Sequence, residues 1–135
     1  MLEPLLRQLS EELELPLSPK DEKGMFHLEI NAELKIALKE LEPGAFLFTK
    51  IGLCPTEKKE ELFLLLMRAN LLGIGTGGSV LALDEDEKFL TLSFVLPYDV
   101  NFKTFKETVE DFSNFVDYWR GELLKFEQSA TQTLL

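Results

Sequence analysis

The feature that most constrains the fold lies in residues 70–97, where a glycine-rich break precedes two apolar runs separated by an acidic turn. Within residues 89–96, apolar side chains recur at every second position, which is typical of a β-strand with one buried face. Because residues 84–87 are all acidic and separate the two runs, the stretch predicts a β-hairpin. The side chains expected to point inward from its second strand are Leu90, Leu92, Phe94 and Leu96.

Residues 62–72, directly before this hairpin, predict a helix that has almost no polar face. Thr56 is a suitable residue to cap its start, and Gly73 a suitable residue to end it. A helix that is apolar on every side must be buried on every side. In a small domain its own sheet covers one side, so the other side predicts a dimer. The residues expected at the interface are Leu62, Leu65, Leu66, Ala69 and Leu72.

A long amphipathic helix is predicted after the hairpin, over residues 102–126, and Pro97 is expected to end the preceding strand. Asn101 or Thr104 could cap this helix. Its apolar face is expected to cover the sheet. The period is lost beyond residue 126, so residues 1–126 predict a single domain and residues 127–135 a flexible tail.

The N-terminal part of the chain predicts a leucine-rich helix, ended near Leu15 by Pro16. Its leucine stripe either packs on its own domain or remains partly exposed to a partner, and the sequence leaves both open. A polar loop follows, and strands are predicted for residues 25–30 and 45–53. Residues 32–42 are rich in helix formers but also alternate, so they fit either a helix or a strand.

Length and composition exclude several classes of protein. A chain of 135 residues with 45% hydrophobic residues is expected to form one folded domain. A formal charge of −10 argues against nucleic acid and anionic membranes as partners, and it fits either solubility or a basic protein partner. One cysteine, no secretory signal and no apolar run long enough to span a bilayer predict a cytoplasmic location.

Few residues offer catalytic chemistry, so we expect no enzyme, no catalytic residue, no cofactor and no metal site. His27 and Cys54 are the single histidine and the single cysteine, and a nucleophilic cysteine would need a base. Residues 84–87 lack the spacing of a calcium loop. The glycines of residues 73–78 follow a helix and lead into a strand without a closing lysine, which is the reverse of a phosphate loop.

Three motifs adjoin one another around the glycine-rich break: Asn70-Leu71-Leu72-Gly73, Thr76-Gly77-Gly78 and Leu81-Ala82-Leu83-Asp84. Together they resemble the central region of the class I type III secretion chaperones, the Tir-chaperone family. The later residues agree in order: residues 90–96 resemble the family's final strand and Pro97 its end. The closing helix and the N-terminal leucine helix also fit. The residues of the closing helix that agree are Phe105, Phe112, Asn114 and Trp119-Arg120.

The resemblance implies an α+β fold of order α-β-β-β-α-β-β-α, with a twisted antiparallel sheet packed with helices and a dimer built through the second helix. It implies that residues 32–42 form a strand, against their propensity. It also implies a bacterial, non-catalytic virulence chaperone that binds the N-terminal segment of a secreted effector protein in extended form. Residues expected to contact this client are Leu2, Leu5, Leu6, Leu9, Leu13, Phe26, Leu28 and Ile30.

Two further questions remain open at the level of sequence. The dimer is expected to be a homodimer, with a heterodimer with a related chaperone as the alternative. The alternative function is a regulatory interaction module of the same fold, which would bind a folded partner such as a transcription component.

Overall fold

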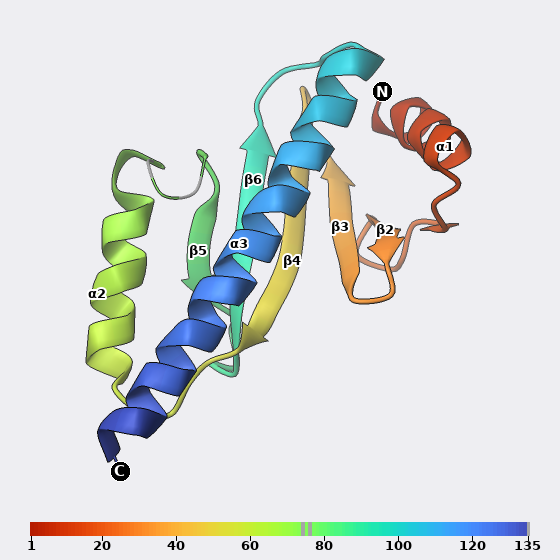
Figure 1. The fold of residues 1–135 in the computed structure, drawn as a ribbon. Coiled ribbons are helices and arrows are strands. Elements are labelled where there is room, and N and C mark those ends of the chain that lie inside the picture. Colours follow the sequence, from red (N-terminus) through yellow and green to blue (C-terminus); the bar gives the residue numbers. More distant parts are fainter. Residues whose placement is uncertain (74, 76, 135) are drawn as a thin grey trace. The chain divides into compact units, whose positions relative to one another are not determined.

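The computed structural model describes residues 1–134 except 74 and 76, and it describes no side chain for residues 72 and 131–134. The predicted order of helices and strands is confirmed, with one short strand added at the start of the sheet (Figure 1). The elements are α1 (Leu2–Leu13), β1 (Leu17–Ser18), β2 (Met25–Asn31), β3 (Leu34–Glu40), β4 (Ala45–Leu53), α2 (Lys59–Asn70), a 3₁₀ turn (Leu71–Gly73), β5 (Val80–Leu83), β6 (Phe89–Leu96) and α3 (Phe102–Leu134).

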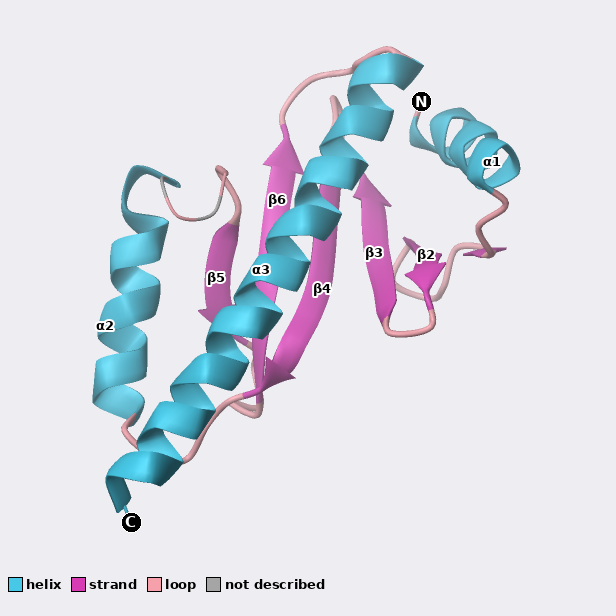
Figure 2. Ribbon diagram, in the orientation of Figure 1, coloured by secondary structure: helices cyan, strands magenta, loops and turns pink. Residues whose placement is uncertain are grey.

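The strands form one six-stranded sheet in the order β1-β2-β3-β4-β6-β5 (Figure 2). Strands β1 to β4 pair antiparallel with their neighbours. The chain divides into two compact units. The first contains residues 1–49 and 93–111, and the second contains residues 50–92 and 112–135, so β4, β6 and α3 each contribute to both.

Strand β3 shows tertiary structure overriding local propensity. Of the two alternatives that composition leaves open for residues 32–42, the strand implied by the family resemblance is confirmed. Leu34, Ile36 and Leu38 are all buried, while the intervening Lys35 is exposed, so the burial follows the period of a strand. These residues have a low intrinsic preference for a strand. Antiparallel pairing with β2 on one side and β4 on the other stabilises the strand instead.

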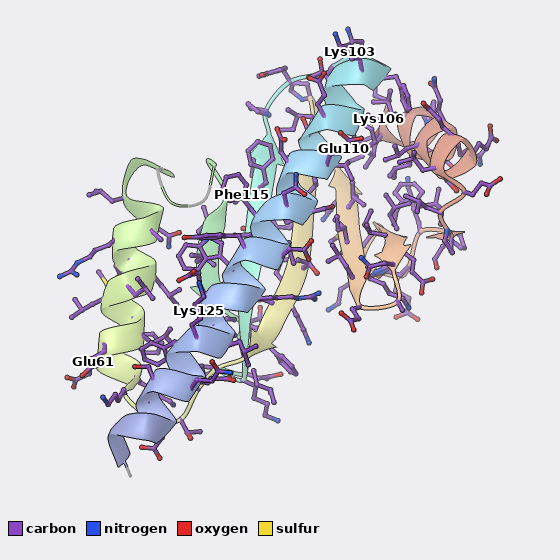
Figure 3. All side chains as sticks on the ribbon, in the orientation of Figure 1. Glu61, Lys103, Lys106, Glu110, Phe115 and Lys125 are labelled. Atoms are coloured by element: carbon purple, nitrogen blue, oxygen red, sulfur yellow. The ribbon has the colours of Figure 1, made fainter. Side chains whose placement is uncertain are left out.

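Helix α1 packs its leucine stripe into the core of the first unit. Leu2, Leu6 and Leu9 are each at most 2% exposed. The backbone N–H of Leu2 donates to Glu40 Oε1 at 2.7 Å, so a strand carboxylate satisfies one of the free donors at the start of the helix. Lys106 Nζ of α3 donates to Glu12 Oε1 at 3.2 Å (Figure 3). Most of the stripe therefore packs on its own domain, whereas Leu5 is half-buried and Leu13 is exposed.

The predicted hairpin of β5 and β6 is closed by Asp84. Its Oδ1 accepts hydrogen bonds from the backbone N–H groups of Lys88 at 2.9 Å and Phe89 at 3.2 Å. Glu87 adopts a positive φ of 58° and donates its N–H to the Asp84 carbonyl. The acidic turn therefore reverses the chain. Of the four residues predicted to point inward from β6, Leu90, Leu92 and Leu96 are buried and Phe94 is half-buried.

Two helix boundaries differ from the sequence prediction. Helix α2 begins at Lys59, after a left-handed Lys58, and no side chain caps it, so the predicted Thr56 cap is wrong. Helix α3 begins where Asn101 Oδ1 accepts from the N–H of Thr104 at 2.9 Å, as predicted. It continues to Leu134, past residue 126 where the apolar period of the sequence ends, and Ala130 in this part is buried.

The glycine-rich turn after α2 needs its glycines for backbone geometry. Gly73, Gly77 and Gly78 have positive φ values, which side chains disfavour. A Cβ on Gly77 would overlap the ring of Phe115, which projects from α3 (Figure 3). Trp119 Nε1 donates to the Gly75 carbonyl at 3.0 Å. Two contacts from α3 therefore fix the course of this turn, and Thr76 of the family motif lies outside the described residues.

We expect Leu9→Ala to lower the free energy of unfolding by about 2–5 kcal/mol, because it leaves a cavity in the core of the first unit. Leu13 lies on the same helix but is 41% exposed, so Leu13→Ala should change the same quantity by about 0.5 kcal/mol or less. Urea denaturation followed by circular dichroism measures both. Equal effects of the two substitutions would contradict the burial of Leu9.

We expect Gly77→Ala to destabilise the protein by about 1–3 kcal/mol, because alanine is strained at a φ of +62° and its methyl group meets the Phe115 ring. Gly121 is the matched control, since a Cβ there meets nothing within 4 Å and the residue lies inside α3. Gly121→Ala should instead stabilise the protein by up to about 1 kcal/mol. Thermal and urea unfolding report both, and a neutral Gly77→Ala would refute the structural role of this glycine.

Candidate functional site

The structure separates the predicted client-binding residues into a buried group and an accessible group. Five of the eight are buried in the first unit, because α1 and β2 turn these side chains toward the core. They are Leu2, Leu6, Leu9, Phe26 and Leu28. Leu5 and Ile30 are half-buried and Leu13 is exposed. Only these three are accessible to a partner in the described conformation.

A shallow surface pocket lies beside the accessible part of α1, within the first unit. It encloses about 230 Å³, including the solvent at its mouth. Its lining includes Leu5 of α1 and, from the segment after β6, Tyr98 and Val100. Tyr98 is 57% exposed, so an apolar side chain of a partner can reach this pocket. The sequence analysis did not identify Tyr98, because it stands alone after Pro97 and belongs to no periodic pattern.

Helix α2 divides its apolar side chains between two opposite faces. The inner face holds three of the predicted dimer residues, Leu62, Leu66 and Ala69, and all three are buried within the second unit. Leu65 is 38% exposed, and the side chain of Leu72 lies outside the described residues. The helix lies alongside β5 (Figure 1), so the chain's own sheet covers the inner face.

The outer face of α2 carries an apolar stripe that the described part of the chain leaves exposed. Leu64 and Met67 of α2 are 53% and 69% exposed, and Leu71, the first residue after the helix, continues their spacing and is 63% exposed. We call these three residues the α2 stripe. Glu61 and Arg68 lie on the same side by helical position. The sequence indicated that the helix is apolar all round, but it did not distinguish the stripe from the inner face.

Asn70 is the residue of the family motif whose role the sequence analysis missed. Its Nδ2 donates to the carbonyl of Leu81 at 2.8 Å, and its Oδ1 accepts from the N–H of the same residue at 2.8 Å. One side-chain amide thus pairs with both backbone groups of a residue on β5. The available signal was the single amide side chain at the end of an otherwise apolar helix.

The histidine and the cysteine each have a structural partner. His27 Nε2 lies 2.8 Å from Asp21 Oδ2, and this hydrogen bond, together with those from Met25 and Lys23, lowers the pKa of Asp21 to about 2. The Cys54 thiol donates to the Pro55 carbonyl at 3.6 Å. Burial raises the pKa of Cys54, which opposes formation of the thiolate that a nucleophile requires.

Among residues 1–73, 75 and 77–134, no group of three histidine, cysteine or acidic side chains has the arrangement needed to hold a metal ion. Asp84 of the acidic turn instead accepts two backbone hydrogen bonds. Within the same described residues, no helix combines the length and the apolar character needed to cross a membrane.

Comparison with known proteins agrees with the motifs in the sequence. The sequence model of the Tir chaperone protein (CesT) family matches residues 4–120. The Chlamydia pneumoniae protein CPj0713/CpB0740 is 30% identical over 105 residues, which are 76% of this chain and 80% of that protein. A chain in the structure of the HopA1–SchA chaperone–effector complex has a TM-score of 0.67 and 20% sequence identity, over 89% of this chain and 93% of that chain.

These comparisons confirm the family that the motifs around Asn70 and Trp119 predicted. The solved structure, at its low sequence identity, supports the fold alone. The family match extends from α1 into the middle of α3 and therefore includes both compact units. The chain belongs to the Tir chaperone protein (CesT) family.

Proposed function

We propose that this protein is a cytoplasmic type III secretion chaperone of a bacterium, which binds the N-terminal segment of a secreted effector in extended form and keeps it competent for secretion. The observation that carries the proposal is the match to the Tir chaperone family over residues 4–120. The likeness in fold to a chain of a chaperone–effector complex is consistent with it. The net charge of −10 favours a protein client over nucleic acid.

Binding without catalysis is the mode of action that the chemistry of the chain favours. The raised pKa of the Cys54 thiol and the pairing of His27 with Asp21 both disfavour a cysteine–histidine site. The accessible residues of the predicted client site, by contrast, are apolar and suited to side-chain burial. They are Leu5, Leu13 and Ile30. Such burial contributes roughly 25 cal/mol per Å² of apolar surface, so a few anchors supply several kcal/mol of binding free energy.

The burial pattern changes which residues we propose as client anchors. Leu2, Leu6, Leu9, Phe26 and Leu28 stabilise the first unit, so a client would have to unfold part of that unit to reach them. The pocket beside Leu5, Tyr98 and Val100 lies at the surface, so a client can contact its rim without such a change. We therefore place the first client anchor at this pocket, with Leu13 and Ile30 as further accessible contacts.

Co-purification tests the proposed function. The tagged protein, isolated from its source bacterium, should retain a secreted effector. That effector should no longer bind after removal of its N-terminal segment, because the extended segment supplies the contact surface. The isolated N-terminal segment of the effector should bind the protein in calorimetry. Tyr98→Ala should weaken this binding, whereas Tyr118→Ala, which removes a similarly exposed tyrosine, should leave it unchanged. Retention of a folded transcription component through its folded domain would favour the regulatory function instead.

We further propose that the protein forms a homodimer through the α2 stripe. A contiguous apolar surface of this kind on an acidic, soluble domain is typical of a protein interface. Because Leu62, Leu66 and Ala69 are buried within the chain, they would support the interface from beneath, and Leu64, Leu65, Met67 and Leu71 would form the contact. The dimer residues predicted from the sequence are revised accordingly.

We expect light scattering to report about twice the chain mass of 15.4 kDa at micromolar concentration. Met67→Glu should reduce this to the mass of one chain, because it would bury an unpaired carboxylate in the interface. Val95→Glu is the control, since Val95 is a similarly exposed apolar residue of the first unit and its substitution should leave the mass unchanged. A folded monomer before any substitution would refute the dimer.

A further inference from the structure

The outer edge of β2 is occupied by the chain itself. Strand β1 pairs with it in the register Leu17↔Leu28 and Ser18↔His27. The N–H of Glu29 donates to the Pro16 carbonyl at 2.9 Å. At the other end of the strand, Met25 donates its N–H to Asp21 Oδ1 at 3.0 Å and accepts from the N–H of Asp21 at 2.9 Å. Residues 16–21, which we call the strap, therefore cover this edge from Met25 to Glu29.

The strap covers the edge of β2, although few of its own side chains are buried. All of its residues except the half-buried Leu17 are exposed. It forms only the two-residue strand β1, whereas β2 and β3 are seven residues long and pair along most of their length. Segments with few buried apolar contacts open at a small fraction of the free energy of global unfolding. The strap is therefore the part of this sheet edge that separates most easily.

Two side-chain contacts hold the far end of the strap: Lys20 Nζ lies 5.5 Å from the centre of the Phe26 ring, and Asp21 pairs with His27. Asp21 Oδ2 lies 2.8 Å from His27 Nε2, and Asp21 Oδ1 accepts from the N–H groups of Met25 and Lys23. A single carboxylate thus fastens the loop to the strand that it covers. Asp21 and His27 are each more than a third exposed, so solvent and a competing segment can reach this fastening.

We propose that the strap is an internal gate: it occupies the edge of β2 that an extended client needs for strand addition, and it must leave before the client pairs there. This inference rests on the proposed function. Strand addition requires free backbone N–H and C=O groups along several residues of an edge strand. The strap takes these groups between Met25 and Glu29, and its own outer edge offers only two residues for pairing.

A reversible lock tests the gate. Ser18 and His27 are direct cross-strand partners, and the separation of such partners lies within the range that a disulfide spans. Ser18→Cys with His27→Cys, in a Cys54→Ser background, locks the strap when oxidised and frees it when reduced. The probe is the N-terminal effector segment identified by the co-purification. We expect the oxidised form to bind it about tenfold more weakly than the reduced form, since the binding-competent fraction falls.

The outcomes separate the gate from the proposed function. Equal affinity of the oxidised and reduced forms would overturn the gate while the chaperone function stands. Binding to neither form, nor to the Cys54→Ser control, would overturn both. Asp21→Ala provides the opposite perturbation, because it releases the strap, and it should increase the affinity of the probe about threefold or more.

Hydrogen exchange tests the opening of the strap without any client. In Asp21→Ala, the amide of Glu29 should exchange about tenfold faster or more, because the strap carbonyl that protects it opens more often. The amide of Leu28 points toward β3 by the alternation of an antiparallel ladder and is the internal control, so its rate should stay unchanged. An unchanged rate for Glu29 would overturn the proposal, whatever the folded state of the variant.

Discussion

The second unit depends on the pairing of the Asn70 side chain with the backbone of Leu81. An amide has the same donor and acceptor geometry as a peptide group, so Asn70 satisfies both backbone groups of a strand residue from the end of a helix. This contact fixes where α2 ends relative to β5. The glycine turn between them then has to reverse the chain in little space, which explains its positive φ values and the two contacts that Phe115 and Trp119 make with it. Arg120 adds hydrogen bonds from Nε and from its terminal nitrogen to the carbonyls of Ile51 and Lys50.

The sequence predicted most of the fold because long periodic segments carry most of the information. The alternation of residues 89–96 and the helical period of residues 102–126 both correspond to observed elements. Strand β3 could not be derived from its own residues, since the leucines and lysines of this segment suit a helix, and only pairing with β2 and β4 decides the matter. Strand β1 was missed because two residues carry no period, and the continuation of α3 was missed because burial of one alanine gives no visible pattern.

The candidate site was harder to predict than the fold, for a physical reason. An apolar stripe contributes the same hydrophobic free energy whether it meets its own domain or another protein. The leucines of α1 and those of α2 therefore look alike in sequence. The structure distinguishes them: Leu6 and Leu9 lie in the core, whereas Leu64 and Met67 lie in solvent. Accessible residues such as Tyr98 stand outside every periodic pattern, so only the folded chain reveals them.

The lengths of the strands have a consequence for solubility. The two outermost strands, β1 and β5, have two and four residues, whereas the inner strands have seven to nine. An exposed edge strand is a template for the growth of sheets from chain to chain, and a short edge strand is a poor one. The short outer strands therefore make the sheet a poor template for open-ended aggregation. The longer inner strands pair over more residues and stabilise the sheet.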